Sequence, residues 1–287
     1  MTEMTEDLKI KKINENDVLV SYDLAQFRNL LDMMNACNYV HRLSFSPSGL
    51  SIHTLDPAYI LLQILEIPAE SFQKYNINST FEVGLKIPQI LEILKTSFLQ
   101  EINLGNSLEI TTIESKEDPR SNGGLSTFIN FKTGPLTFSV KAISLNSIKP
   151  VPREPKLSYK FEFSIPTEKL HNALTLVSTF SAYTDHIKFE GTRLFAGRDP
   201  NWAPDEGNLD DVCYSLQGTE LMQTETGNPI PTSRFTHGFL FDIIDPLRNI
   251  ASESLISLRT DYPMKISAIG SGGERITLIL APRSDTV

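Results

Sequence analysis

The sequence predicts a strand-rich α+β fold made of two copies of one structural plan. Three observations support this prediction. A set of residues recurs about half a chain later, each copy opens with an amphipathic helix pattern, and short apolar runs are separated by turn residues. At 287 residues, the chain has room for two domains of ordinary size.

The repeat consists of matched residues in matched order. Asn29 and Asn172 lie in similar segments, Phe27–Leu31 and Leu170–Leu174, and are 143 residues apart (172 minus 29). Further matches at offsets of 143 or 144 pair Phe45, Leu50 and Asp56-Pro57 with Phe189, Leu194 and Asp199-Pro200. A third set at an offset of 156 (243 minus 87) pairs Ile87, Leu91 and Leu94 with Ile243, Leu247 and Ile250. An added loop at Asn201–Asp210 accounts for most of the extra length, so the pattern indicates a duplicated domain.

Each copy is expected to contain two short helices. The first helices carry apolar residues at helical spacing, namely Leu24, Phe27, Leu30, Leu31 and Met34 in one copy and Leu170, Ala173, Leu174 and Val177 in the other. Asp23 is the expected N-cap of the first, and Ser164 or Thr167, near Pro166, that of the second. The second helices are expected at Ile87–Lys95, with Pro88 in its first turn, and at Ile243–Ala251, with Pro246 early.

Strands are expected between these helices. His41–Phe45 and Leu50–Leu55 flank the turn Ser46–Gly49 and predict a hairpin. Tyr59–Ile67 is a further apolar strand that ends at Pro68. More strands close each copy, among them Leu136–Ile143 and, after the turn Gly270–Gly273, Ile276–Leu280.

A proline-rich segment divides the two copies. Ile143–Tyr159 contains Pro150, Pro152 and Pro155 together with three basic residues, which predicts an extended linker that is either a passive spacer or part of a site. The expected division is therefore an N-terminal extension (1–17), a first domain (18–142), a linker (143–159) and a second domain (160–287). The extension and the segment Ser115–Gly124 are expected to be disordered or looped.

Composition and charge restrict the class of function. The net charge of −9, from 26 basic and 35 acidic residues, argues against a free-standing DNA reader but allows DNA that is held by enclosure. No motif for a metal, cofactor or catalytic set is found, and the two cysteines are expected to be reduced thiols. The chain has no membrane-span pattern and no signal-peptide core, so we expect a cytoplasmic or nucleoid protein in a prokaryote or archaeon, a nuclear one in a eukaryote, and no secretion.

Three segments resemble the proliferating cell nuclear antigen (PCNA) family. Tyr262-Pro263-Met264, followed by Leu278–Arg283, is similar to the end of that family, where a last strand closes with Leu-Ala-Pro and a basic residue. Gly49–Ile60 resembles a family segment with an aliphatic strand and a Leu-Asp turn. Gly84 and the helix Ile87–Lys95 together resemble a third segment of the family. The resemblance as a whole covers roughly residues 18–283.

The resemblance implies a DNA-clamp fold in which three subunits form a six-domain ring around duplex DNA. Strands Leu136–Ile143 of one subunit and Asp211–Gln217 of the next would pair, with interface residues Leu136, Phe138, Val140, Val212, Tyr214 and Leu216. A partner's short peptide would enter an apolar pocket under the linker, formed by Leu55, Tyr59, Ile60, Leu62, Ile148, Val151, Pro152, Pro263, Ala281, Pro282 and Arg283.

The resemblance also implies helices that face DNA. Their basic residues would be Arg28, Lys86, Lys95, Lys169, His171 and Arg248, and neighbouring acids make the lining close to neutral. Such residues are either merely solvated, or make few transient DNA contacts, or are supplemented by more basic sibling subunits in a heterotrimer.

The implied protein is a non-enzymatic processivity factor, as a homotrimer or a heterotrimer. It would tether DNA polymerase, clamp loader, nuclease and ligase by short peptide motifs. Two alternatives stay open: a checkpoint-type or virus-encoded relative with altered partners, and a duplicated α+β enzyme whose site carries no recognisable motif.

Overall fold

The computed structural model describes residues 19–95, 107–117, 125–151, 154–179, 186–196, 212–216, 218–224 and 229–283. Within these ranges the two halves have the same order of elements, nine strands and two helices each. The first half comprises β1 (Val20–Asp23), α1 (Leu24–Asn35), β2 (Val40–Ser46), β3 (Gly49–Leu55), β4 (Leu61–Pro68), β5 (Lys74–Tyr75), β6 (Phe81–Lys86), α2 (Ile87–Lys95), β7 (Ser107–Glu117), β8 (Leu125–Thr133) and β9 (Leu136–Lys141). The second comprises β10 (Phe161–Pro166), α4 (Thr167–Ser178), β11 (His186–Glu190), β12 (Arg193–Ala196), β13 (Val212–Ser215), β14 (Glu220–Thr224), β15 (Thr232–Thr236), α5 (His237–Leu247), β16 (Glu253–Leu258), β17 (Met264–Ile269) and β18 (Arg275–Leu280).

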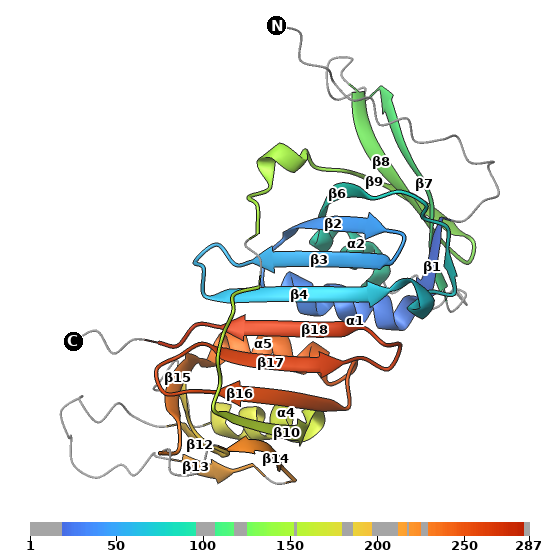
Figure 1. Cartoon of the computed structure of the whole chain (residues 1–287). Coiled ribbons are helices and arrows are strands. Elements are labelled where there is room, and N and C mark those ends of the chain that lie inside the picture. The colour runs from blue at the N-terminus through green and yellow to red at the C-terminus, as the bar shows by residue number, and fades with distance from the viewer. Residues whose placement is uncertain are drawn as a thin grey trace, which may run out of the picture.

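The sheets repeat as the elements do. The first half forms a five-stranded sheet of order β5-β1-β7-β8-β9, and the second half forms the equivalent order β14-β10-β16-β17-β18. Each half also has a four-stranded group, β4-β3-β2-β6 in the first and β13-β12-β11-β15 in the second. Strands β18 and β4 pair antiparallel over six residues, so the two halves share one nine-stranded sheet (Figure 1). The predicted duplicated α+β fold is confirmed.

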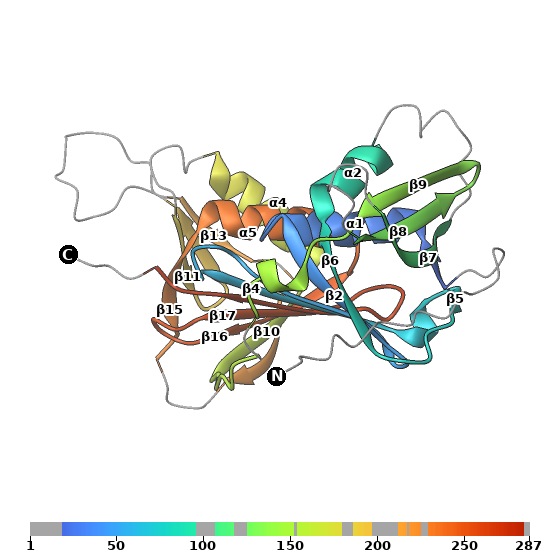
Figure 2. The same cartoon turned by 90° about the horizontal axis from the view of Figure 1, so that it is seen from above.

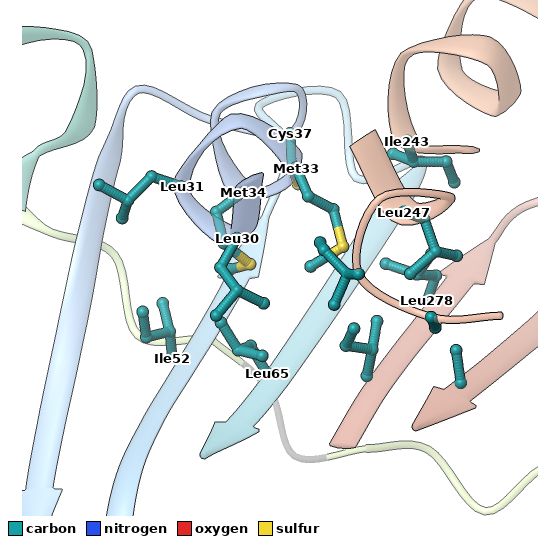
Figure 3. Packing of buried hydrophobic residues seen from close by; sticks show 14 of the residues in the cluster. Leu30, Leu31, Met33, Met34, Cys37, Ile52, Leu65, Ile243, Leu247 and Leu278 are labelled. Carbon is teal, nitrogen blue, oxygen red and sulfur yellow. The ribbon is translucent and has the colours of Figure 1, made fainter. Parts of the chain in front are cut away.

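The helices of the described residues, α1, α2, α4 and α5, lie on one face of this nine-stranded sheet, as the edge-on view in Figure 2 shows. Helices α1 and α5 pack against each other where the halves meet. In Figure 3, Leu30, Met34, Ile243 and Leu247 point from these helices toward strand residues such as Leu278, and all five are at most 1% exposed. Burial of such a side chain stabilises a fold by about 1.5–3 kcal/mol, so this seam holds the halves together.

Several local predictions are confirmed by the structure. Asp23 caps α1, because its side chain accepts a hydrogen bond from the N–H of Gln26 at 2.8 Å. Helix α2 has the predicted bounds with Pro88 in its first turn. Phe45 pairs with Leu50 across one hairpin, and Phe189 pairs with Leu194 across the equivalent one, as their common offset predicts.

Two helix predictions in the second half are wrong. Helix α5 begins at His237, which is 150 residues after the start of α2 at Ile87, so the predicted offset of 156 does not match equivalent positions. Pro246 therefore lies in the last turn, where its missing N–H ends the helix instead of starting it. Pro166 occupies the N-cap of α4, and Thr167 instead shares a hydrogen bond with the hydroxyl of Ser254 at 2.9 Å.

Two strand boundaries also differ from the predictions. Strand β4 begins at Leu61 because Tyr59 stands in a turn with a φ of 61°, outside the range of a strand. Ser115, expected in a loop, belongs to β7, whose ladder with β8 continues to the pair Glu117 and Leu125. The linker includes a short 3₁₀ helix, η2 (Leu145–Ser147), and is not extended throughout. The predicted extension 1–17 and the loop Asn201–Asp210 lie outside the described residues.

Candidate functional site

The linker after β9 runs across the face of the nine-stranded sheet opposite the helices, in front of β4 and β18 in Figure 1. Near its start, the N–H of Ile143 donates to the carbonyl of Gly84 at 2.8 Å. A Cβ atom at Gly84 would come within 2.6 Å of both the carbonyl oxygen of Ile143 and the side chain of Ile148. Glycine at this position therefore allows the linker to lie directly on β6.

Arg42 of β2 binds the same part of the linker from the sheet beneath it. Its guanidinium donates to the carbonyl of Leu145 at 3.1 Å, lies 3.5 Å from that of Ile148, and forms an ion pair with Glu82 at 3.0 Å. At the other end of the linker, Lys265 of β17 pairs with Glu154 at 2.7 Å. The linker is thus fastened to both halves of the molecule.

A cavity of about 430 Å³ lies beneath the first part of the linker. Four residues predicted for the peptide pocket line it, namely Leu55, Tyr59, Ile148 and Val151. Other lining residues come from β2, β3, β6, the turns before β2 and after β3, and the linker: Asn38, Val40, Arg42, His53, Thr54, Asp56, Pro57, Lys86, Ile143, Ser147, Lys149 and Pro150. A cavity of this size is in the range that accepts a few side chains of a ligand or peptide.

The floor of the cavity is fixed by a chain of hydrogen bonds. Nδ2 of Asn38 donates to the carbonyl of Leu55 at 3.1 Å, and Nε2 of His41 lies 2.6 Å from the carbonyl of Asn38. Burial lowers the pKa of His41 to about 4, so the ring is neutral near pH 7 and Nε2 carries the donated proton. The neutral ring therefore helps to orient Asn38 without placing a charge under the cavity.

A tight turn presents Tyr59 at the mouth of the cavity. The buried carboxylate of Asp56 accepts hydrogen bonds from the N–H groups of Ala58, Ile60 and Leu61 at 2.9, 2.5 and 2.6 Å. These bonds hold Tyr59 in a left-handed conformation that costs free energy for a residue with a side chain. As a result the Tyr59 ring is 62% exposed, and Nζ of Lys149 lies 5.6 Å from its centroid.

An apolar cluster under the middle of the linker adjoins the cavity. Leu62 and Ile64 of β4 and Ile279 of β18 are buried together, with Leu55, Val151 and Leu157 packed against them. Leu62, one of the predicted pocket residues, thus lies in this cluster and does not line the cavity. The sequence argument missed Ile64, Leu157 and Ile279, although the alternation of β4 and β18 could have indicated that they share the outer face.

The predicted C-terminal wall is only partly placed by the structure. The N–H of Ala281 donates to the carbonyl of Ile60 at 2.8 Å, which puts the chain after β18 beside the turn. Ile60 packs against the main core, and the cavity lining does not include it, Pro263, Ala281, Pro282 or Arg283. Pro152 lies outside the described residues.

A second cavity, of about 630 Å³, lies under the other end of the linker. Tyr159, Glu162, Ser257 and Lys265 are among its lining residues. The hydroxyl of Tyr159 is buried without a partner among the described residues, and burial raises its pKa. No sequence motif indicated this cavity, because its residues come from the linker and three strands.

The helix face carries a mixture of charges. Three basic and five acidic residues lie within the four helices: Arg28, Lys95, Lys169, Asp32, Glu92, Glu168, Asp242 and Asp245. Lys95 pairs with Asp32, while Arg248 just after α5 pairs with Glu168 and Asp245 at 3.3 and 3.2 Å. Basic and acidic side chains on the helix face thus partly cancel each other through ion pairs within the chain, in line with the predicted near-neutral charge of this face.

Two of the residues predicted to face DNA are placed elsewhere. His171 is only 8% exposed, because Phe241 lies 5.5 Å away and Nε2 of the ring contacts Asp245 at 3.0 Å. Lys86 lines the cavity under the linker. The helical pattern gives the spacing of residues, but it does not show that Phe241 lies against the His171 ring or that Lys86, at the end of β6, lies beside the linker.

The strands predicted for the subunit interface are both at sheet edges. Strand β9 is the last strand of the five-stranded sheet, and β13 is the last of the separate four-stranded sheet. On β9, Val140 is buried and Phe138 stacks on Phe131 at 5.1 Å, so alternate side chains of this strand pack inward while its backbone edge lies at the end of the sheet. Tyr214 and Leu216 lie on and just after β13; the side chain of Val212 is not among those described.

No family model matches the chain, but solved structures and curated relatives do. The PCNA of Archaeoglobus fulgidus in complex with the C-terminal region of FEN-1 superimposes with a TM-score of 0.74 at 21% identity, covering 93% of this chain and 99% of that one. The PCNA of Entamoeba histolytica superimposes with a TM-score of 0.70 at 16% identity, covering 93% of this chain and 100% of that one. Proteins named DNA polymerase sliding clamp from Methanosarcina barkeri and A. fulgidus are 23% and 24% identical, each over 85% of this chain and 89% of the relative. The chain therefore has the fold of PCNA and is similar in sequence to DNA polymerase sliding clamps over most of its length.

The PCNA fold explains the placement of the site in this chain. The linker, with the cavity and the apolar cluster beneath it, lies on one face of the nine-stranded sheet, and the helices lie on the opposite face. Among the described residues, no helix is long and apolar enough to cross a membrane. Within the same ranges no group of three or more His, Cys, Asp or Glu side chains is arranged to hold a metal ion.

Proposed function

We propose that this chain is a DNA sliding clamp of the PCNA family and that it closes into a ring of three two-domain subunits. The ring encircles duplex DNA and tethers DNA polymerase and other replication or repair enzymes through the cavity under the linker. It acts without chemistry of its own, because tethering raises the local concentration of an enzyme at its template.

One observation carries the ring proposal: among the described strands, β9 and β13 each have an edge without a partner, whereas their equivalents β18 and β4 are paired within the chain. By their position in the repeated sheet order, β9 corresponds to β18 and β13 corresponds to β4. The antiparallel β18–β4 pairing therefore provides a template for pairing β9 of one subunit with β13 of the next. Such a head-to-tail contact gives a closed ring when its rotation closes, and it removes both exposed edges.

We propose the same boundaries as the sequence indicates, with residues 18–142 and 160–287 as the two clamp domains and 143–159 as the connecting linker. The linker residues bonded to Arg42 and Lys265 span the junction of the halves, which supports this division. The first 17 residues are assigned as an extension.

The helix face would line the ring. Its basic residues would contact DNA phosphates; they are Arg28, Lys95, Lys169 and Arg248. The ion pairs of Lys95 with Asp32 and of Arg248 with Glu168 would weaken the contacts that these two residues make with phosphates. Weak and transient contacts suit a protein that must slide. Localisation follows from this role: the cytoplasm or nucleoid of a cell without a nucleus, or the nucleus of a eukaryote.

Two measurements test the proposal. Light scattering should give the mass of three subunits, for this chain alone or with related clamp subunits. After loading by a clamp loader, the protein should stay on nicked circular DNA in high salt and should slide off when the DNA is linearised. A strictly monomeric chain that neither joins related subunits nor is retained on circles would contradict the proposal.

Partner docking is tested separately with Tyr59. Tyr59→Glu should abolish binding of a peptide with aliphatic and aromatic anchors and leave ring assembly intact. Tyr39, which is 67% exposed and does not line the cavity, offers a matched control, and Tyr39→Glu should bind normally. Equal affinity of the Tyr59→Glu variant and the parent would refute the assignment of the pocket.

A further inference from the structure

The charges around the first linker cavity indicate which peptides it accepts, given the docking role proposed above. Four basic side chains line this cavity: Arg42, His53, Lys86 and Lys149. Asp56 is the one acidic residue among the described lining residues, and it is 4% exposed. Because three backbone N–H groups occupy its carboxylate, Asp56 has little capacity left to neutralise a cation at the rim.

The two lysines of this rim are without acidic partners in the described part of the chain. Arg42 is neutralised by Glu82 at 3.0 Å, whereas no described carboxylate forms an ion pair with Lys86 or Lys149, and both lysines are exposed. The contact described for Lys149 is with Tyr59, whose ring centroid is 5.6 Å and whose hydroxyl is 3.4 Å from Nζ. The cavity therefore has a positive rim in a chain whose net charge is −9.

The positive rim is specific to this part of the linker. In the second cavity, Lys265 is already paired with Glu154 at 2.7 Å, and Glu162 accepts a hydrogen bond from Ser257 at 2.6 Å. Basic and acidic residues thus balance there, but not at the first cavity. A local excess of one sign selects partners of the opposite sign and speeds their association.

We propose that the peptide segment docking beneath residues 143–151 carries acidic side chains next to its apolar anchors. Its carboxylates would contact Lys149 and Lys86, while the anchors enter the cavity beside Leu55 and Val151. A carboxylate offers the Lys149 ammonium a stronger partner than the face of Tyr59, so docking would draw Lys149 away from the ring and free it for contact with the peptide.

Two synthetic peptides with the same aliphatic and aromatic anchors test this inference, one flanked by aspartate and glutamate and the other by lysine and arginine. We expect the acidic peptide to bind the full chain about five- to tenfold more tightly at low ionic strength, and this preference to shrink as salt is added. In the double variant Lys86→Glu/Lys149→Glu, the preference should reverse. Lys74→Glu, on the exposed strand β5 and outside the cavity lining, is the matched control and should keep it.

The outcomes separate this inference from the docking role itself. Equal binding of both peptides, or tighter binding of the basic one, with loss of both in Tyr59→Glu would overturn the charge preference and leave the docking role intact. If neither peptide binds the unaltered chain, the docking role fails as well. A preference unchanged in the double variant would place the responsible charges elsewhere and would also overturn the inference.

Discussion

The carbonyl of Asp56 accepts a hydrogen bond from the N–H of Tyr59 at 3.0 Å while the Asp56 carboxylate caps the next two N–H groups, those of Ile60 and Leu61. One buried side chain thereby determines how an exposed tyrosine is presented. Cys37 lies below the same turn, where its thiol donates to the carbonyl of Leu61 at 3.3 Å, and burial followed by the charge of Asp56 raises its pKa. The turn thus depends on polar groups that the hydrophobic pattern alone does not reveal.

We therefore predict that Asp56→Ala destabilises the first half and weakens peptide binding. Three backbone N–H groups lose their acceptor, and one unsatisfied buried donor costs about 1–3 kcal/mol, so the loss should reach about 3 kcal/mol. Urea unfolding measures it. Asp32→Ala, which breaks a partly exposed pair with Lys95, should change stability by less than about 1 kcal/mol. Similar losses in both variants would show that Asp56 has no special role.

The sequence predicted the duplicated plan well because periodicity and turn residues report local structure. Phe45 and Phe189 were matched correctly, since each sits next to a tight hairpin. The second helix of the second half was misplaced, because Pro246 can stand in the first turn of a helix or end one, and only packing of Leu240 and Ile244 decides.

The site was predicted less completely than the fold. Leu55 and Tyr59 were found because they lie in Gly49–Ile60, one of the segments that carry the family resemblance. Arg42 was missed, since its contacts to Leu145 and Ile148 join residues more than 100 positions apart. Such contacts depend on the tertiary fold, which no local pattern encodes.

Gly84 offers a test of how tightly the linker must lie on β6. Gly84→Ala would place a Cβ atom 2.6 Å from the carbonyl oxygen of Ile143, so the linker must lift and the cavity beneath it must change shape. We expect peptide affinity to fall about tenfold or more, with a stability loss of about 1–3 kcal/mol. Gly238 of α5 has nothing within 4 Å of such an atom, so Gly238→Ala should bind normally and gain up to about 1 kcal/mol. Normal peptide binding by Gly84→Ala would show that linker contact is dispensable.

The open edge of β9 predicts a variant that disrupts assembly but spares the fold. The N–H of Ala142 donates inward to Thr127, and alternation along the strand therefore directs the N–H of Thr137 toward the open edge. Thr137→Pro removes that donor without breaking the ladder to β8, so ring dissociation should occur at about tenfold higher protein concentration. Light scattering over a dilution series measures this shift. Thr137→Ala keeps the N–H and should assemble normally; equal behaviour of both variants would place the interface elsewhere.

The helix face predicts a salt-sensitive effect on DNA. Arg28→Glu combined with Arg248→Glu removes two positive charges and adds two negative ones per subunit, and the second change also leaves Glu168 and Asp245 beside a new carboxylate. We expect slower loading and faster loss from circular DNA at low ionic strength. Lys188→Glu, a charge reversal on strand β11 and outside the helices, serves as the control and should load normally. Unchanged loading by the double variant would mean that these arginines do not meet DNA.

Glu274 predicts how stability depends on pH. Its carboxylate is 0% exposed at the turn between β17 and β18, where Oε2 accepts from the N–H of Gly272 at 3.0 Å and Oε1 has no partner among the described residues. Burial raises the pKa of Glu274 above its ordinary value of 4.5, so the group stabilises the fold while protonated and loses that contribution as pH rises through its folded-state pKa.

Glu274→Gln keeps an acceptor for Gly272 and cannot ionise. Chemical unfolding of both proteins between about pH 4 and pH 8 should therefore show the variant gaining relative stability as pH increases. Glu66, exposed on the neighbouring strand β4, gives the control Glu66→Gln, which makes the same substitution at a position in contact with water. A constant stability difference between Glu274→Gln and the parent over this range would mean that Glu274 ionises as readily in the folded chain as in the unfolded one.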